Sequence, residues 1–509
     1  MSLSRNLVAG MTSSIWTALV GLAVVPLYLN YLGIEAYGLV GFLATLQSIF
    51  SLLDLGLSTT INRETARFSA SGNLNEAGKL LHTLAVIYWS MAAVIALFVV
   101  LTSSFIAGHW LNATHIPNET IIHAVMMMGF IIACRWPIGL YQGALMGAQR
   151  LTISSSVNIA MTTIGSLGAV GILAFVSPTI QALFIWQAVT GLIYALTMRR
   201  AAWGIIGRKA IRFEIDALRR TWHFSMGISA ITVTALIFIQ LDKVILSKTL
   251  KLEDFGRYML ATNIVSGLYS IIMPVYNVIY PQFSALVSSG EHEKLGALYR
   301  SGTRFLASIL FPIAATLAIF SMNLVKIWTG NPELASDVAP LIALLAIGSA
   351  LHGVMFFPYA LQLAHGMTRL PIKINAILMI IQVPLIISLS LSYGALGGAI
   401  AWLVLHVLYV LLGTWLTHRE LLKKTGQIWL FSDVGIPLAL SLIAGCFEYY
   451  LNKLAGYPDY MKLFFGGMST LLAIFCSFAI SPQMRSILPG YAGRQTKHLT
   501  GERTTDNRR

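Results

Sequence analysis

The chain has 509 residues, of which 56% are hydrophobic and 11% are charged, and its mean hydropathy is +0.74. Soluble domains carry about 25% charged residues, so this composition excludes a soluble globular protein. A net charge of +14 would indicate a nucleic-acid partner in a soluble chain. In a membrane protein the same charge reports topology, and we expect no nucleic-acid partner.

Long apolar segments follow one another along the whole chain. A hydrocarbon core of about 30 Å takes roughly 20 apolar residues per helix, and helices satisfy their own backbone hydrogen bonds in lipid. We therefore predict an all-α polytopic membrane protein with about 14 transmembrane helices. The predicted spans are 6–30, 37–60, 79–103, 120–143, 151–176, 179–198, 222–246, 255–280, 303–322, 337–361, 371–391, 395–416, 434–450 and 461–480.

The loops between these segments carry Lys and Arg on alternate sides. Most of the 34 basic residues fall on one side, and a dense group lies between positions 199 and 221. The positive-inside rule then places both termini in the cytoplasm. The basic stretch could be an amphipathic helix at the cytoplasmic headgroups, or an ordinary basic loop that obeys topology.

Two halves of the chain are related by a spacing of 218 residues. The segment 32–38 resembles the segment 250–256, and the same spacing relates Gly78 to Gly296 and Tyr141 to Tyr359. Each half holds six helices, an even number, so the repeat is parallel. This predicts two pseudo-symmetric six-helix lobes and two extra helices. The boundaries are 1–198 for the N-lobe, 199–221 for a basic linker, 222–416 for the C-lobe, 417–433 for a cytoplasmic loop, 434–480 for the last two helices and 481–509 for a cytoplasmic tail.

One basic residue, Arg135, lies near the middle of a predicted span. A charge inside lipid costs roughly 2.5–3.5 kcal/mol on insertion scales, so it usually faces a bundle interior or a wet cavity. Arg135 could hold an anionic group of a substrate in a central cavity. It could instead be a structural ion-pair partner, or snorkel to the headgroups.

A polar stripe runs along the second predicted helix. Gln47, Ser51, Asp54 and Ser58 are spaced so that one helical face carries all four. These residues could line a substrate cavity, and Asp54 could bind a coupling ion. The alternative is a buried hydrogen bond between helices, or a salt bridge from Asp54 to Arg63.

A matching stripe of polar and aromatic residues runs along one face of the eighth predicted helix. By the 218-residue spacing, Ser51 corresponds to Tyr269 and Ser58 to Tyr276. Tyrosine offers a sugar ring both an apolar plane and a hydroxyl, so Tyr269 and Tyr276 are substrate-binding candidates. The alternative is that these tyrosines belong to the ordinary aromatic belt of the membrane interface.

Asp242 and Lys243 lie together at one end of the seventh predicted helix. Adjacent residues on a helix do not face each other, so separate partners are expected. Asp242 could pair with Arg135, bind a coupling cation, or form an interfacial ion pair.

Histidines also occur in the apolar part of the chain and could titrate near neutral pH. Each is isolated in the sequence, which favours a structural role. They are His223, His352, His365 and His406.

Motifs for chemistry are missing from the sequence. There is no nucleotide-binding Walker A pattern, no metal-ligand spacing and no loop large enough for a catalytic domain. We therefore predict no enzymatic activity, no cofactor and no metal.

Several motifs in order resemble a known family. They are Leu32-Gly-x-Glu-x-Tyr-Gly38, Asp54-Leu-Gly-Leu57 followed by Arg63 and Arg67, Gly143-x-x-x-Gly147-x-Gln149-Arg150, Gln240-x-Asp242-Lys243 and Phe255-Gly256-x-Tyr258. Over residues 6–416 the chain resembles the polysaccharide transporter branch of the MOP flippase superfamily, which includes the Wzx-type O-antigen flippases.

The resemblance implies two six-helix lobes around a central, often cationic, cavity. It implies flipping of undecaprenyl-diphosphate-linked glycans across a bacterial inner membrane for cell-surface polysaccharide and lipopolysaccharide biosynthesis. Lipid II flippases of this superfamily use their last two helices to form part of a groove for the lipid tail, and 434–480 could do the same. In this chain only Arg135 is deeply placed, whereas cavities of the family often hold several Arg or Lys.

The sequence thus predicts a lipid-linked oligosaccharide flippase that works by alternating access. Its expected partners are the glycan substrate, membrane lipids, a coupling cation or proton, and glycan polymerase and glycosyltransferases. The alternatives are a cation-coupled multidrug exporter of the same superfamily and a membrane scaffold that recruits glycan-assembly enzymes.

Overall fold

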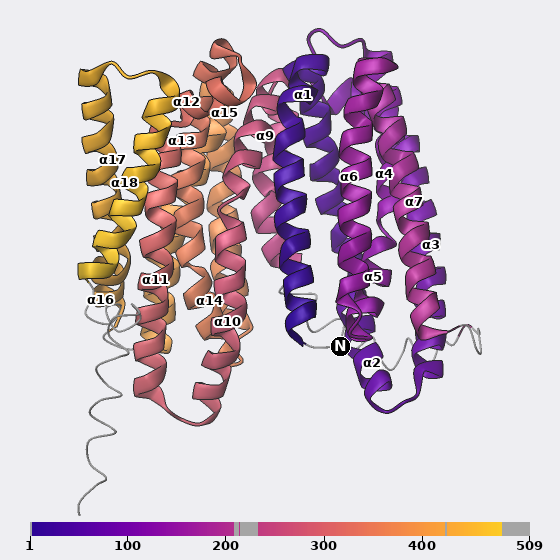
Figure 1. The fold of residues 1–509 in the computed structure, drawn as a ribbon, viewed down its shortest axis with the longest axis horizontal. Helices are drawn as coiled ribbons and strands as arrows, with labels where there is room; N and C mark the ends of the chain where they lie inside the picture. Colours follow the sequence, from indigo (N-terminus) through magenta and orange to yellow (C-terminus); the bar gives the residue numbers. More distant parts are fainter. Residues whose placement is uncertain (1–2, 208–212, 214–232, 423–424, 481–509) are drawn as a thin grey trace, which may run out of the picture. The chain divides into compact units, whose positions relative to one another are not determined.

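The computed structural model describes residues 3–207, 213, 233–422 and 425–480, and almost all of them are helical (Figure 1). Among these residues, eleven helical segments are long and apolar enough to cross a membrane. The predicted all-α, membrane-spanning class is confirmed, while the number of fourteen crossings stays a prediction. The elements of the first part are α1 (Leu3–Ser51), η1 (Leu52–Asp54), α2 (Leu57–Ala70), α3 (Leu74–Phe105), η2 (Ile106–Trp110), α4 (Asn118–Arg135), α5 (Ile138–Gly147), α6 (Leu151–Phe175) and α7 (Ile180–Ile206).

A helix over 233–249 follows the undescribed residues. The remaining elements are α9 (Leu252–Ser266), α10 (Tyr269–Ser288), α11 (His292–Ile319), α12 (Ser321–Thr329), α13 (Pro332–Val354), α14 (Phe356–Ala364), α15 (Arg369–Glu420), α16 (Gly426–Ile428), η3 (Trp429–Gly435), α17 (Ile436–Ala455) and α18 (Asp459–Ile480). The predicted cytoplasmic loop at 417–433 is therefore largely helical in its described part.

Two helices are each long enough for two crossings and bend at a glycine. α1 leaves helical geometry at Gly33, which has φ 78° and ψ 171°, and α15 does so at Gly394, which has φ 59° and ψ −137°. Positive φ strains residues with a side chain but not glycine, so the chain can redirect there. The bends fall between the predicted spans 6–30 and 37–60, and between 371–391 and 395–416.

Several predicted helices are interrupted within the membrane-spanning region. Leu55 and Gly56 adopt left-handed conformations, so the second predicted helix ends before residue 60. The predicted span 120–143 divides at Trp136 and Pro137 into α4 and α5, because proline cannot donate the helical hydrogen bond. The predicted span 337–361 divides at Met355 into α13 and α14.

Helix boundaries repeat with the 218-residue spacing found in the sequence. α2 ends at Ala70 and α10 at Ser288, α3 begins at Leu74 and α11 at His292, and α5 begins at Ile138 and α14 at Phe356. The turn glycines Gly72 and Gly290 have nearly the same φ, 71° and 72°. The internal repeat is therefore present in the secondary structure as well as in the sequence.

The described chain forms two compact units. Unit 1 comprises Met1–Asn263 and Met379–Gly398, and unit 2 comprises Ile264–Leu378 and Ala399–Arg509. The predicted boundaries of the lobes stay predictions. Of the predicted linker, 199–206 continue α7, and most of the rest lies outside the described residues, as do the tail 481–509 and His223.

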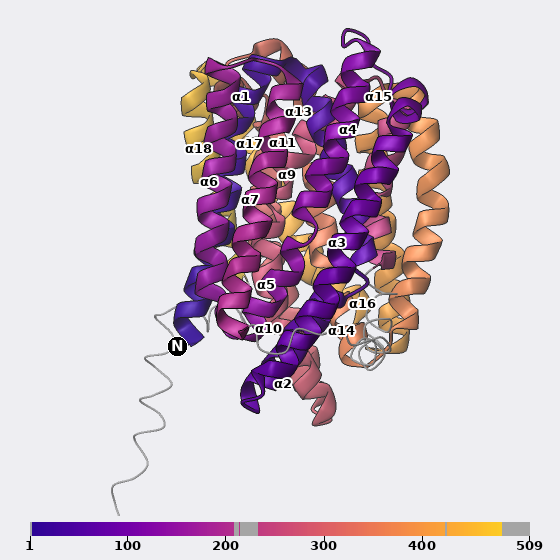
Figure 2. The ribbon, with the colours of Figure 1, turned by 90° about the vertical axis from the view of Figure 1, so that its right-hand side faces the viewer.

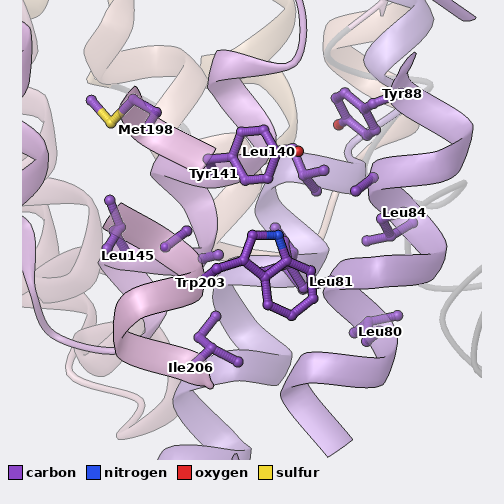
Figure 3. Close-up of a cluster of buried hydrophobic side chains, with 14 of the residues drawn as sticks. Leu80, Leu81, Leu84, Tyr88, Leu140, Tyr141, Leu145, Met198, Trp203 and Ile206 are labelled. Atoms are coloured by element: carbon purple, nitrogen blue, oxygen red, sulfur yellow. The ribbon is translucent and has the colours of Figure 1, made fainter. Parts of the chain in front are cut away.

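Unit 1 has a core where α3, α5 and α7 meet. In Figure 3 the side chains of α3, α5 and α7 point toward one another. The contributing positions on α3, residues 80, 81, 84 and 88, follow helical spacing and so form one apolar stripe. Figure 2 shows this part of the chain from the side, with α3 beside α4 and α6 beside α7. This packing holds the helices that carry the pocket described below.

The two copies of the repeated motif touch each other within unit 1. A Cβ at Gly38 would overlap Leu252, and a Cβ at Gly256 would overlap the carbonyl of Ile34. Because Ile34 and Leu252 are themselves 218 residues apart, the two contacts are reciprocal, as in a two-fold interface. Gly41 faces its own counterpart, since its Cβ would lie 2.7 Å from Met259 Cβ. The second half of α1 therefore crosses α9 at a local pseudo-two-fold axis.

In unit 2 the last two helices, α17 and α18, lie beside α11 (Figure 1). Side chains attach these helices and the preceding η3 to α11 and α12 at three levels. At one end Asp433, which is fully buried, pairs with Arg300 at 2.8 Å and with Arg304 at 2.7 Å. In the middle the hydroxyls of Thr316 and Thr470 are hydrogen-bonded at 2.5 Å. At the other end Lys326 Nζ lies 2.7 Å from Asp459 Oδ2. The hairpin formed by α17 and α18 is thus held to α11 and α12 along its length.

We expect Asp433→Ala to lower the free energy of unfolding by about 3–5 kcal/mol, because the change leaves two partly buried guanidinium groups without their carboxylate. Asp459→Ala is the matched control. Its ion pair is more exposed, with 25% and 43% of the two side chains accessible, so the expected loss is below about 1 kcal/mol. Thermal unfolding of the detergent-solubilised variants measures both effects. Equal melting temperatures would contradict the assigned role of Asp433.

Candidate functional site

Arg135 lies in a pocket of unit 1 with a volume of about 280 Å³. Side chains of α1, α4, α5, α6 and α7 line it, and they are Tyr28, Arg135, Ile138, Met161, Thr162, Gly165, Ser166, Gln187, Thr190, Gly191 and Tyr194. Among these described lining residues, Arg135 alone carries a formal charge. The pocket therefore presents one positive group among hydroxyls, an amide and aromatic rings.

Local sequence places Arg135 at the last position of α4. Pro137 has no N–H to donate to a carbonyl of α4, so the helical hydrogen bonds are interrupted here and α4 ends. The carboxyl end of a helix carries partial negative charge, which favours a cation. Gly191 on α7 makes room for the side chain, since a Cβ there would lie 3.2 Å from Arg135 Cγ.

The guanidinium is bonded to a neutral group. Arg135 Nη2 donates to Gln187 Oε1 at 3.3 Å. Within the described residues Arg135 forms no ion pair, and the pairing with Asp242 considered from the sequence does not occur. An amide leaves the positive charge uncompensated, so the group remains available to an anion.

A chain of hydrogen bonds begins at one wall of this pocket. Tyr194 Oη donates to Asn158 Oδ1 at 2.9 Å and accepts from Gln142 Nε2 at 3.2 Å. Asn158 Nδ2 in turn donates to Ser13 Oγ at 2.8 Å. The network holds Tyr194 in place, and it joins α1, α5, α6 and α7 behind the pocket.

Asp54 is used as a local hydrogen-bond acceptor. Ser58 Oγ donates to Asp54 Oδ1 at 2.6 Å, Ser58 N donates to Asp54 Oδ2 at 3.3 Å, and the hydroxyl of Tyr88 donates to Oδ1. The carboxylate thus accepts a hydrogen bond from a backbone N–H of the first turn of α2 and joins α2 to α3. The salt bridge to Arg63 is absent, because Arg63 pairs with Glu64 at 2.6 Å. The prediction that Ser58 shares a continuous helical face with Gln47, Ser51 and Asp54 is wrong, because the helix breaks at Leu55 and Gly56.

Asp242 and Lys243 form a buried pair with each other. Lys243 Nζ lies 3.1 Å from Asp242 Oδ1, and Tyr258 Oη donates to Asp242 Oδ2 at 2.7 Å. The expectation of separate partners is wrong, because the long lysine side chain folds back to its neighbour. A role of Asp54 or Asp242 in binding a coupling ion stays a prediction.

The predicted tyrosines belong to unit 2. Tyr269 Oη lies 2.7 Å from His352 Nδ1. Tyr276 lies in an aromatic group, with its ring centroid 5.8 Å from that of Tyr280 and 6.3 Å from that of Tyr359. Both tyrosines are partly buried. The prediction that these residues and the stripe of Gln47 and Ser51 line one common cavity stays a prediction.

Sequence reasoning missed Gln187, Asn158 and Tyr194. Each is a polar residue in an apolar span, which is the signal that could have identified it. It also described His352 and His406 as isolated, whereas their ring centroids lie 4.8 Å apart in unit 2.

A family profile described as "Polysaccharide biosynthesis protein" matches residues 30–332 of this chain. This match covers more than half of the 509 residues. The chain belongs to the polysaccharide biosynthesis protein family. The resemblance to the polysaccharide transporter branch of the MOP superfamily is thereby confirmed.

Two related proteins align with most of this chain. A Shigella flexneri protein, to which O-antigen transport is provisionally assigned, is 21% identical over 82% of this chain and 98% of its own length. An uncharacterised membrane protein of Bacillus subtilis, EpsK, is 21% identical over 80% of this chain and 82% of its own length.

The fold of this chain is similar to that of several solved structures. The lipid II flippase MurJ in an inward closed conformation aligns with a TM-score of 0.67 at 12% identity, covering 94% of this chain and 98% of that one. An inward-facing multidrug transporter of the MATE family aligns with a TM-score of 0.64 at 14% identity, covering 79% and 95%. The chain is thus a multi-span membrane protein with the fold of the MOP superfamily.

Proposed function

We propose that this chain is a flippase for an undecaprenyl-diphosphate-linked oligosaccharide. It would move its substrate from the inner to the outer leaflet of a bacterial plasma membrane, with both termini in the cytoplasm. The family, the O-antigen transporter relative and the fold of a lipid II flippase support this proposal. The observation that carries it is the uncompensated Arg135 in a polar pocket of unit 1.

The pocket has the chemistry that a glycosyl diphosphate requires. A guanidinium binds phosphate oxygens through two parallel N–H groups, and such charge-assisted bonds are stronger than neutral ones. Gln187, Thr190 and Tyr194 offer amide and hydroxyl groups to a sugar. Tyr276 and its stacked neighbours in unit 2 offer apolar planes to a sugar ring.

The membrane potential would drive the transfer. A diphosphate that leaves the negative cytoplasmic side gains about 2.3 kcal/mol per charge for each 100 mV. The polyprenyl tail would stay in lipid while the two repeats change their packing in alternating access. Glycan polymerase and glycosyltransferases stay predicted partners.

Translocation in reconstituted vesicles tests the proposal. The probe is a fluorescent undecaprenyl-diphosphate-linked disaccharide placed in one leaflet, and its arrival in the other leaflet is followed by chemical quenching. We expect a rate at least about tenfold above protein-free vesicles, and faster transfer under a potassium diffusion potential. Vesicles that move the probe no faster than empty ones would contradict the proposal.

The similarity to the fold of a multidrug transporter makes a cation-coupled exporter the second candidate function. A cation-coupled exporter would protect cells from hydrophobic cations, while a glycan flippase would not. Drug sensitivity of a deletion strain, measured beside the lipid-linked precursors that accumulate in it, separates the two functions.

A further inference from the structure

Two histidines that lie far apart in the sequence form a pair inside unit 2. His352 on α13 and His406 on α15 are 6% and 0% exposed, and their ring centroids are 4.8 Å apart. Both helices are candidate membrane spans. Ionisable residues at such positions commonly mark ion or proton pathways.

The tautomer of His406 follows from its neighbour on the same helix. His406 Nδ1 lies 2.8 Å from the carbonyl oxygen of Trp402. A carbonyl only accepts hydrogen bonds, so Nδ1 carries the hydrogen and donates. In the neutral ring, Nε2 is then the basic nitrogen, and it is the atom that would accept a proton.

His352 connects the pair to Tyr269, which is a candidate substrate-binding residue. Its Nδ1 lies 2.7 Å from Tyr269 Oη, so one of the two atoms donates to the other. When His352 is neutral with hydrogen on Nε2, the tyrosine hydroxyl donates to Nδ1. When His352 is protonated, Nδ1–H donates to the tyrosine oxygen, and the hydroxyl hydrogen becomes available to another acceptor.

The short separation of the two rings limits the pair to a single proton. Two imidazolium groups at this separation would repel each other, so the first proton opposes the second and the two rings titrate as a unit. Among the described residues, the titratable side chains in contact with the pair include Tyr269 from α10 and Tyr409 from α15. Rings of the described part that also pack against it are Phe356 from α14 and Trp402 from α15.

We propose that His352 and His406 form a proton-binding site that takes one proton, and that the hydrogen bond between His352 and Tyr269 reverses when this proton resides on His352. The hydroxyl of Tyr269 then donates to the sugar of the substrate only while His352 is protonated. The proton is thus the coupling ion of unit 2. This role in transport rests on the proposed flippase function, whereas the proton site itself does not.

A matched control exists on the same helix. His418 is also buried, and its Nδ1 lies 2.8 Å from the carbonyl of Thr414, as in His406. Its ring packs against Tyr299 and Trp429. Asparagine places an amide donor where Nδ1–H lies, so His→Asn variants keep the backbone hydrogen bond at both positions.

Proton counting tests the site without any substrate. The full chain in detergent is taken from about pH 8 to about pH 5 in weak buffer, and proton uptake is followed with an indicator dye. We expect the double variant His352→Asn with His406→Asn to take up one proton fewer than the native chain. Each single variant should lose none, because the remaining ring still binds the shared proton. Loss of two protons, or of none, from the double variant would overturn the proposal.

Vesicle transport tests the coupling. With the potential clamped at zero, one coupled proton raises the accumulation ratio of the fluorescent disaccharide lipid up to about tenfold per pH unit. We expect Tyr269→Phe to keep native proton uptake and to lose this dependence, whereas His418→Asn should keep both. A pH gradient that drives Tyr269→Phe as well as the native chain would overturn the switch.

The two proposals fail in different ways. If the native chain moves no probe while the proton count matches the expectation, the flippase function fails and the proton site stands. If the chain moves the probe and the count does not match, the proton site fails alone.

Discussion

An Arg135→Ala variant is expected to translocate the fluorescent disaccharide lipid roughly 10–100-fold more slowly than the native chain at low probe concentration. Hydrogen bonds to charged groups contribute about 1.5–3 kcal/mol each, and every 1.4 kcal/mol corresponds to a tenfold change in affinity. Among the described residues that line the pocket, no second charged side chain can replace the guanidinium. The vesicle assay measures the rate.

Two further variants decide why the rate falls. Arg135→Lys keeps the charge but not the planar pair of donors, so it should recover part of the rate. Arg257→Ala removes an arginine of unit 1 that is bonded to Glu253 and Asp254 outside the pocket, and it should transport normally. If Arg257→Ala were as slow as Arg135→Ala, the loss would reflect general damage.

The Arg135→Ala variant also distinguishes a transport function from a scaffold function of this chain. A deletion strain that carries Arg135→Ala should export little surface glycan if the protein itself moves the substrate. If the variant fails in vesicles and yet restores export in cells, the chain acts by recruiting other proteins.

The second prediction concerns the crossing of α1 and α9. Gly41→Met is expected to reduce the yield of folded protein severely, because its Cβ would lie 2.7 Å from Met259 Cβ. Overpacking of this kind costs about 1–3 kcal/mol, and more where backbone must move. Size-exclusion chromatography and thermal unfolding measure the loss.

The pseudo-two-fold axis makes a rescue possible. In the exchanged variant, Gly41→Met with Met259→Gly, the large side chain comes from α1 and the space from α9, so the contact is rebuilt with the two residues exchanged across the axis. We expect most of the stability to return, as a non-additive double-mutant cycle. Gly296→Met is the control, since no atom lies within 4 Å of its added Cβ. Additive losses in the exchanged variant would show that the two positions are not equivalent.

Features that depend on composition and spacing could be predicted from the sequence. Apolar length located the membrane helices, and the matched motifs at 32–38 and 250–256 located the repeat. The breaks at Leu55 and at Met355 could not be predicted in this way, because hydropathy continues through them. The break before Pro137 had a local signal in the proline itself.

Partnerships across the chain were the harder part. Asp54 accepts a hydrogen bond from the hydroxyl of Tyr88, and the ring of His352 lies beside that of His406, because helices that are distant in sequence pack together. A single sequence contains periodicity but not these pairings. Arg300 and Arg304 illustrate the same point: the sequence shows them only as basic residues near the start of the predicted span 303–322, yet both bind Asp433.

The attachment of α17 and α18 has a mechanical consequence. The buried pair of Asp433 with Arg300 and Arg304 and the hydroxyl pair of Thr316 and Thr470 tie the hairpin to α11, so we expect the hairpin to move together with α11. Any tilt of α11 during a transport cycle would sweep the hairpin through the surrounding lipid as one body. A hydrocarbon chain in contact with α17 or α18 would then move together with the hairpin. The movement of a long polyprenyl tail would thereby be coupled to the conformational change that transfers the headgroup.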